Sequence, residues 1–192
     1  LDYRQTFADV SSHWAKSDIE VMAKKLIARG VSGDSFAPDA PLTRAQFAAF
    51  LVRLLGLEEE RPAVPAFADL PLDPWAYGAV AAALKAGLVK GTGEKTFTPD
   101  REITREEIAV MLLRVLEQKG LAPKVEEKEV KALLARYGDG EKVSTWAKKA
   151  VAAAIKGGLL GGKLPNLLAP QDKATRAEAM ALLKRFGDSL EG

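Results

Sequence analysis

The sequence predicts an all-α protein of three tandem helix-loop-helix repeats. Two observations predict it: a tryptophan that recurs at a fixed distance before a Thr-Arg pair, and an apolar stripe with helical spacing after each pair. The distance is 29 residues in each copy, from Trp14 to Thr43, Trp75 to Thr104 and Trp146 to Thr175. A single unit of this kind cannot bury its apolar face alone, so we expect the three copies to pack on one another.

The repeat boundaries follow from an alignment on these tryptophans. The copies span about residues 7–56, 67–117 and 137–187. Other positions recur with them: Phe36, Phe97 and Leu168 at offset 22, and Pro38, Pro99 and Pro170 at offset 24. We therefore divide the chain into repeat 1 (residues 1–60), repeat 2 (61–120) and repeat 3 with a linker helix (121–192), which together are expected to form one module.

The first helix of each repeat is expected to begin near its tryptophan. Apolar residues occur at offsets 5, 8 and 9 in every copy, which is the spacing of one helical face. Gly87 and Gly158 lie where a C-terminal cap requires a positive φ. The first copy has Leu26 at this position, and we expect its glycine cap to be delayed to Gly30.

The second helix is indicated by a capping box at each of the three threonines. Gln46, Glu107 and Glu178 complete these boxes three residues later. The apolar stripes that follow have i, i+3, i+4, i+7 spacing, so each second helix offers one face to a common core. The stripes are Phe47, Phe50, Leu51 and Leu54; Ile108, Met111, Leu112 and Val115; and Ala179, Leu182, Leu183 and Phe186.

The linker before the third repeat has a pattern of its own. Residues 121–136 and the following Tyr137 carry apolar side chains at helical spacing, which predicts a short extra helix there. Glu127 and Lys131 form an i, i+4 pair that is expected to solvate this helix and to stabilise it modestly.

The composition is that of an ordinary soluble globular protein, with 47% hydrophobic and 28% charged residues among 192. A formal charge of +2 argues against nucleic acid as a partner. No apolar run approaches the roughly 20 residues that span a bilayer, so no membrane insertion is expected. Because the chain starts at Leu rather than Met, we expect a processed or excised fragment.

Neither a cofactor nor a metal site is expected. The chain has no Cys and a single histidine, His13, which is expected to be exposed or to cap a helix. The segment around Asp34 lacks the alternating oxygen ligands and the closing Glu of a calcium loop. No set of nucleophile, base and orienting residue is evident, so the chain is not expected to be an enzyme.

The arginine at the first position of each second helix is the first candidate for a binding role. A helix N-terminus offers unpaired N–H groups and a positive dipole, and a guanidinium beside it makes a site for a carboxylate or phosphate. The alternative is that Arg44, Arg105 and Arg176 pair with a nearby acid such as Asp39 or Asp100. A cation at the positive end of a helix is unfavourable, which favours the ligand role.

The tryptophans and the loops between the helices are further candidates. Trp14, Trp75 and Trp146 each start an amphipathic helix, which favours core packing over stacking on a sugar ring, although both roles can coexist at the edge of a groove. Loop glycines allow close backbone approach to a ligand, although a tight turn is the simpler role for any one of them. The loop candidates are Gly30, Ser32, Gly33, Gly91 and Gly93, and the third loop, 161–166, departs from this composition.

The repeated pattern Phe-x-Asp, Trp-Ala, Gly-x-x-Gly, Phe-x-Pro-Asp and Leu-Thr-Arg-Ala-Gln resembles the S-layer homology domain over about residues 7–187. The second and third copies carry the Thr-Arg-x-Glu hallmark of that family. The resemblance implies a pseudo-threefold α-helical assembly around a central three-helix bundle, with grooves between repeats. It also implies non-covalent, extracellular anchoring to the bacterial cell wall or S-layer through a secondary cell-wall polymer, often one with pyruvylated N-acetylmannosamine.

The same resemblance implies site residues and partners. Arg44, Arg105 and Arg176 are the expected partners of the ketal carboxylate of this anionic glycan, and they face the second, third and first repeats in turn. The third repeat has Gln171 where the first two have an aspartate after the recurring proline, and its loop is altered, so Arg176 is expected to contribute less to binding than Arg44 and Arg105. A monomer with an intramolecular pseudo-trimer is expected. The alternatives are peptidoglycan tethering and protein–protein contact, and a wall hydrolase has no catalytic constellation to support it.

Overall fold

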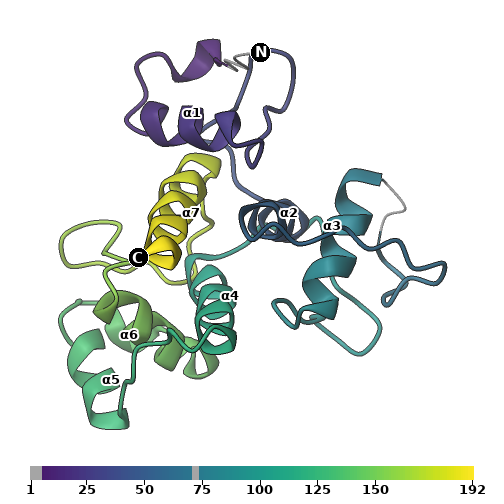
Figure 1. The fold of residues 1–192 in the computed structure, drawn as a ribbon. Coiled ribbons are helices and arrows are strands. Elements are labelled where there is room, and N and C mark those ends of the chain that lie inside the picture. Colours follow the sequence, from purple (N-terminus) through teal and green to yellow (C-terminus); the bar gives the residue numbers. More distant parts are fainter. Residues whose placement is uncertain (1–5, 71–73) are drawn as a thin grey trace. The chain divides into compact units, whose positions relative to one another are not determined.

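The structure, a computed structural model, describes residues 6–70 and 74–192, with the side chains of Pro74 and Trp75 outside the description. Its described part consists of seven α-helices and three short 3-10 helices, with isolated β-bridges and no strand (Figure 1). The all-α prediction is thereby confirmed. The chain forms two compact units, residues up to Glu102 with those from Ala174 onward, and Ile103–Lys173. The pseudo-threefold arrangement, the central bundle and the single module stay predictions.

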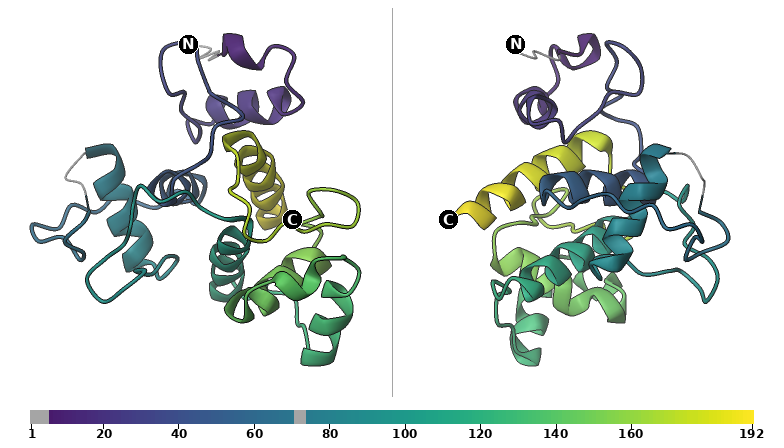
Figure 2. Two further views of the ribbon diagram at one scale, coloured as in Figure 1. Left: turned by 180° about the vertical axis from the view of Figure 1, so that it is seen from behind. Right: turned by 45° about the vertical axis from the view of Figure 1, so that its right-hand side comes forward.

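The first unit contains four α-helices from both ends of the chain. They are α1 (Lys16–Lys24), α2 (Arg44–Leu54), α3 (Pro74–Lys85) and α7 (Arg176–Glu191), preceded by the 3-10 turn η1 (Ala8–Val10). Helix α3 packs on α2, α1 packs on α7, and α2 also contacts α7. Figures 1 and 2 show α1 beside the start of α7, although more than 150 residues separate them in sequence. Phe47 and Phe186, from the predicted stripes, are fully buried.

The second unit contains three α-helices and two 3-10 turns. They are α4 (Arg105–Gln118), α5 (Glu127–Leu134), η2 (Gly140–Lys142), η3 (Thr145–Ala147) and α6 (Lys148–Lys156). Helix α6 packs on both α4 and α5. The extra helix predicted in the linker is therefore confirmed as α5, which buries Leu133 and Leu134. No ion pair joins Glu127 to Lys131 in this fully described unit, so that expected pair is not formed.

The packing pairs the second helix of one repeat with the first helix of another. Helix α2 of repeat 1 takes α3 of repeat 2, α4 of repeat 2 takes α6 of repeat 3, and α7 of repeat 3 takes α1 of repeat 1. Each apolar stripe is thus covered by a different copy, as the repeat pattern predicts. A single repeat would leave both of its stripes in water, so an isolated copy is expected not to fold.

The ends of the first helices match the sequence prediction at two of three copies. Gly87 and Gly158, just after α3 and α6, have φ values of 70° and 71°. Leu26 has φ 60° at the equivalent place, so the expected delay of the cap to Gly30 is wrong. A branched side chain in the left-handed region costs about 1 kcal/mol. The packing of Ile27 and Ala28 directly after it, both buried, offsets that cost.

The predicted capping boxes are complete at Thr43 and Thr175, whereas at Thr104 the threonine bond to the N3 N–H is formed without the reciprocal bond of a full box. Thr43 Oγ1 accepts the N–H of Gln46 at 3.1 Å, and the Gln46 side chain accepts the N–H of Thr43 at 3.0 Å. Thr175 and Glu178 repeat the box at the start of α7. At the start of α4, Thr104 Oγ1 accepts the N–H of Glu107 at 3.3 Å. These bonds fix the position of the residue that follows each threonine, which is the candidate arginine.

Candidate site at the repeat junctions

Each candidate arginine reaches from the start of its helix into the repeat that the sequence assigns to it. The Nε donates to the carbonyl of the offset-22 residue of that repeat, and Nη2 donates to a carbonyl several residues earlier. The bonds are Arg44 to Phe97 (3.1 Å) and Lys90 (2.9 Å), Arg105 to Leu168 (2.9 Å) and Gly161 (3.1 Å), and Arg176 to Phe36 (2.8 Å) and Arg29 (2.6 Å). We call these three side chains the junction arginines.

The junction arginines differ in their accessibility. Arg44 is 5% exposed and Arg176 only 3%, whereas Arg105 is half-buried. The Arg176 guanidinium also lies 4.6 Å from the ring centroid of Phe36 and 5.7 Å from that of Phe50. Burial lowers the pKa of Arg176, and the nearby Asp9 carboxylate acts in the opposite direction. Arg105 is therefore the junction arginine with the most surface for a ligand.

The helix N-termini beside these arginines are already occupied. The backbone N–H groups of Arg44 and Ala45 donate to the carbonyls of Arg101 and Pro99, at 2.9 and 3.0 Å. Equivalent bonds run from Arg105 and Glu106 to Asp172 and Pro170, and from Arg176 and Ala177 to Ala40 and Pro38. The capping threonine takes the third N–H. The expectation of unpaired N–H groups for an anion is therefore wrong.

Sequence reasoning missed a second set of site residues, the aspartate that ends each Phe-Ala-Asp or Tyr-Gly-Asp segment and bonds a loop of its own repeat. Their carboxylates accept the N–H of the offset-22 residue and of the residue after it: Asp9 from Phe36 (2.9 Å) and Ala37 (2.7 Å), Asp69 from Phe97 and Thr98 (both 2.8 Å), and Asp139 from Leu168 and Ala169 (both 2.8 Å). We call these the loop aspartates. Their recurrence at nearly constant spacing was the signal that could have found them.

The pKa of each loop aspartate lies below its usual value. For Asp9 the N–H of Phe36 has the largest effect and lowers the pKa. For Asp69 and Asp139 burial has the largest single effect and raises the pKa, but the N–H donors together outweigh it. The folded loop therefore favours the ionised carboxylate.

The loop aspartates hold a strained backbone. Ala37, Thr98 and Ala169 have φ values of 54°, 52° and 50°, and each precedes one of the recurring prolines. This left-handed conformation is unfavourable for residues with a Cβ. In each loop the aspartate binds the N–H of the strained residue, and the junction arginine binds the carbonyl just before it. Together they fix the loop on both sides of the strained peptide.

Replacement of Ala169 by glycine is expected to raise the free energy of unfolding by about 0.5–1 kcal/mol, because glycine adopts this φ without strain. Urea unfolding followed by circular dichroism measures it. The control is Ala132→Gly on the exposed face of α5, which is expected to lower stability by about 1 kcal/mol. A loss at Ala169 as large as that at Ala132 would contradict the strain.

The tryptophans that could be described lie on the surface. Trp14 is 66% exposed and Trp146 is 61% exposed, so core packing, the role that their position favoured, is wrong for both. The side chain of Trp75 lies outside the described residues. Trp14 lies 5.4 Å from the ring of His13, whose Nδ1 accepts the N–H of Ala15 and whose Nε2 bonds Asp39 at 2.8 Å. The bond to Ala15 lies just before the first turn of α1, which has no side-chain cap, and His13 is half-buried, so neither of its two expected roles is confirmed.

Of the loop candidates, Gly30 and Gly91 serve the turn. A Cβ on Gly30 would lie 2.7 Å from Phe7, and one on Gly91 would lie 2.5 Å from Phe67. Gly162 makes the same close approach to Tyr137 in the third loop. Gly33 has open space around it, and Ser32 and Gly93 are exposed at the loop tips. These three are the fully exposed members of the set, whereas Gly30 and Gly91 are half-buried.

The contact between repeats 2 and 3 that Arg105 makes includes a buried carboxylate, Glu106, that the other two contacts lack. Glu106, 3% exposed, accepts the N–H and the hydroxyl of Ser144 at 3.0 and 2.7 Å. The Gln171 amide donates to both oxygens of the Glu106 carboxylate at 3.2 Å. Repeats 1 and 3 have Ala45 and Ala177 where repeat 2 has Glu106. Gln171, which replaces the aspartate of the other repeats, therefore pairs with Glu106, which replaces their alanine.

Comparison with known families fits this repeated geometry. The family model of the S-layer homology (SLH) domain matches residues 6–48, 66–109 and 136–180. This chain belongs to the SLH family. Each match ends within the second helix of its repeat, just after the junction arginine, so the SLH pattern contains both the loop aspartate and the arginine.

Relatives of this SLH module occur in larger proteins. The module is 36% identical over 183 residues to an amylopullulanase of Thermoanaerobacterium thermosulfurigenes, covering 95% of this chain and 10% of that protein. It is 29% identical to an S-layer protein of Bacillus thuringiensis subsp. finitimus, covering 95% and 22%. It is 32% identical to a cellulosome-anchoring protein of Acetivibrio thermocellus, covering 82% and 34%. The module thus spans at most about a third of these relatives.

The SLH module is a non-catalytic part of such proteins. In relatives with enzyme names the matched segment is a small, separate share of the chain, as the 10% in the amylopullulanase shows. The described residues contain no group of three His, Asp or Glu side chains that could hold a metal ion. None of the described helices is long and apolar enough to cross a bilayer.

Proposed function

We propose that this SLH module anchors a surface protein non-covalently to the bacterial cell wall. The ligand is an anionic secondary cell-wall polymer that carries pyruvylated N-acetylmannosamine. Membership of the SLH family supports wall anchoring, and the names of the S-layer and cellulosome-anchoring relatives agree with it. The module would then act outside the cell, at the wall or in the S-layer.

The observation that carries the proposal is the exposure of Trp14 and Trp146 at equivalent positions of two repeats. A largely exposed indole contributes little to folding, because burial of apolar area is the source of its stabilisation. Its flat face is suited to the apolar face of a sugar ring. An exposed aromatic face at the same position of more than one repeat suits a polymer with repeating sugars.

The junction arginines supply the positive charge in this proposal. Arg105, half-buried, is the best placed to meet a ketal carboxylate, while Arg44 and Arg176 act mainly through the loops they fix. The exposed loop tips at Ser32, Gly33 and Gly93 would line the edges of the ligand site. Several modest contacts along one polymer give strong avidity without a single tight site.

Replacement of Trp14 by alanine is expected to weaken polymer binding about tenfold, equal to about 1.4 kcal/mol. The free energy of unfolding should change by less than about 0.5 kcal/mol, because the side chain is exposed. Calorimetric titration with purified secondary cell-wall polymer measures the affinity, and urea unfolding measures the free energy of unfolding. Polymer stripped of its pyruvate ketals is expected to bind weakly to the unaltered module.

Two controls define the outcome. Trp14→Phe keeps an aromatic face and should retain most of the affinity, and Val64→Ala, at a 79% exposed side chain, should change nothing. Equal binding of polymer with and without ketals would refute the carboxylate-reading function and favour peptidoglycan tethering. Unchanged affinity in Trp14→Ala would remove the stacking role.

A further inference from the structure

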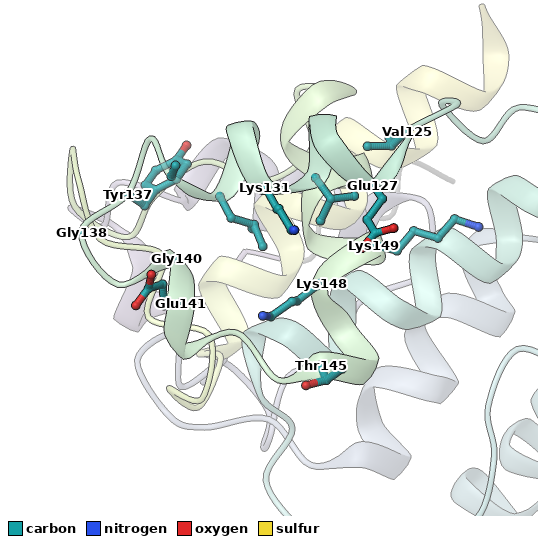
Figure 3. A pocket seen from close by; sticks show the side chains of 13 residues that line it. Val125, Glu127, Lys131, Tyr137, Gly138, Gly140, Glu141, Thr145, Lys148 and Lys149 are labelled. Atoms are coloured by element: carbon teal, nitrogen blue, oxygen red, sulfur yellow. The ribbon is translucent and has the colours of Figure 1, made fainter.

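The second unit contains a pocket of about 940 Å³ that none of the junction residues lines. Helix α5 forms one wall, and the turns η2 and η3 with the start of α6 form the other (Figure 3). The volume falls in the range of pockets that hold small organic ligands, about 300–1,000 Å³. Between the first two repeats the described linker residues 57–70 form no helix, so the wall that α5 supplies is particular to this place in the chain.

The pocket combines an apolar wall with three lysines, of which Lys149 is paired with Glu117. Val130 and Leu134 of α5 line it, together with the ring of Tyr137. Figure 3 shows Lys131, from α5, and Lys148, from the start of α6, with their ammonium groups directed toward the hollow. The pocket is therefore amphipathic, with its cationic groups contributed by two different helices.

Neither Lys131 nor Lys148 has an ion-pair partner in this fully described unit, although other lysines there do. Lys149 bonds Glu117 at 3.4 Å and Lys156 bonds Glu129 at 2.8 Å. Two acids, Glu127 and Glu141, also line the pocket, and Figure 3 shows Glu141 at one end beside Gly140 and Glu127 near Lys149. Two ammonium groups that face one hollow repel each other, and a bound anion would reverse the sign of that interaction.

We propose that this pocket binds an organic anion of about the size of a sugar unit, with one carboxylate or phosphate and one apolar face. The anion lies between Lys131 and Lys148, and the apolar face lies on Val130 and Leu134. The hydroxyl groups of Tyr137 and Thr145, both in the lining, can hydrogen-bond a polar edge of the ligand. This site is separate from the junction arginines, so it can exist whether or not the proposed anchoring function holds.

The test is a nuclear magnetic resonance titration of the ¹⁵N-labelled chain with D-glucuronate, glucose 6-phosphate and, as a neutral match, glucose. The expected result is a saturable shift of the amide signals of Gly138, Gly140 and Thr145 with either anion at millimolar concentration, and none with glucose. Addition of purified secondary cell-wall polymer then distinguishes the sources: displacement of the probe indicates a polymer unit, and no displacement indicates a free anion.

A charge-matched pair of variants separates the pocket from general electrostatics. Lys131→Gln with Lys148→Gln is expected to weaken probe binding at least fivefold. Lys119→Gln with Lys128→Gln removes the same charge from exposed side chains of this unit that do not line the pocket, and should weaken it less than twofold. Neither pair of variants alters a junction arginine, so a loss of probe binding in Lys131→Gln with Lys148→Gln is independent of polymer binding at the junctions.

Three results would overturn the proposal. The first is the absence of saturable shifts with both anions up to about 20 mM. The second is an equal response to glucose, which would show that the lysines do not select charge. The third is stronger binding of a tetraglutamate peptide than of either sugar anion, which would assign the pocket to an acidic protein segment.

Discussion

Replacement of Arg176 by alanine is expected to lower the free energy of unfolding by about 3 kcal/mol. The change leaves the buried carbonyl of Phe36 and the partly buried carbonyl of Arg29 without their charged donor, and it removes the contact with two aromatic rings. It also weakens the packing of α1 of repeat 1 on α7 of repeat 3. Urea unfolding at neutral pH measures the loss.

Two further variants show whether this role belongs to the junction. Arg185→Ala removes an exposed arginine from the same helix and should cost less than about 0.5 kcal/mol. Arg176→Lys keeps the charge but cannot span both carbonyls, so an intermediate loss is expected. If Arg176→Ala and Arg185→Ala have equal stability, the arginine does not hold the junction, and a purely ligand-binding role becomes the better interpretation.

Replacement of Asp139 by asparagine is expected to cost about 2 kcal/mol at pH 7. Asp139 is 8% exposed, and its carboxylate accepts two backbone N–H bonds, one with each oxygen, from Leu168 and Ala169. An amide can accept only one of them and places an NH₂ group against the other donor, and bonds to a charged acceptor contribute about 1.5–3 kcal/mol each. Urea unfolding measures the difference.

The effect of Asp139 should depend on pH in a defined direction. Its pKa in the folded protein lies below the usual 3.8, so the stabilisation is complete above about pH 4. It is lost as the pH falls below that value through the folded pKa. Asp172→Asn, at a surface carboxylate paired with Lys163, is the control with a small cost. A loss in Asp139→Asn that is the same at pH 7 and pH 3 would contradict this account.

The helices could be predicted because their signals are local. A capping threonine with Gln or Glu three residues on, followed by a stripe of helical period, fixes where a second helix starts and which face is apolar. The extra helix α5 was predicted from the helical spacing of its apolar residues alone. Leu26 was the exception, since its positive φ is imposed by the buried residues that follow it and not by its own preference.

The candidate site was predicted in part. The sequence identified the arginines, and its resemblance to the SLH domain implied the repeat that each one faces. It did not show that carbonyls from that neighbour occupy the N–H groups at each helix start, or that Trp14 and Trp146 are exposed. Both facts depend on which surfaces the neighbouring repeat covers.

By itself, the sequence determined the three SLH repeats, their helices and the arginine at the start of each second helix, because these depend on spacing within one segment of chain. Only the tertiary structure decided that the arginines and loop aspartates act together on strained loops, and that α5 and α6 enclose a pocket with Lys131 and Lys148. The physical reason is that these features join residues 27 to 147 positions apart or from separate helices, and local propensity carries no information about such contacts.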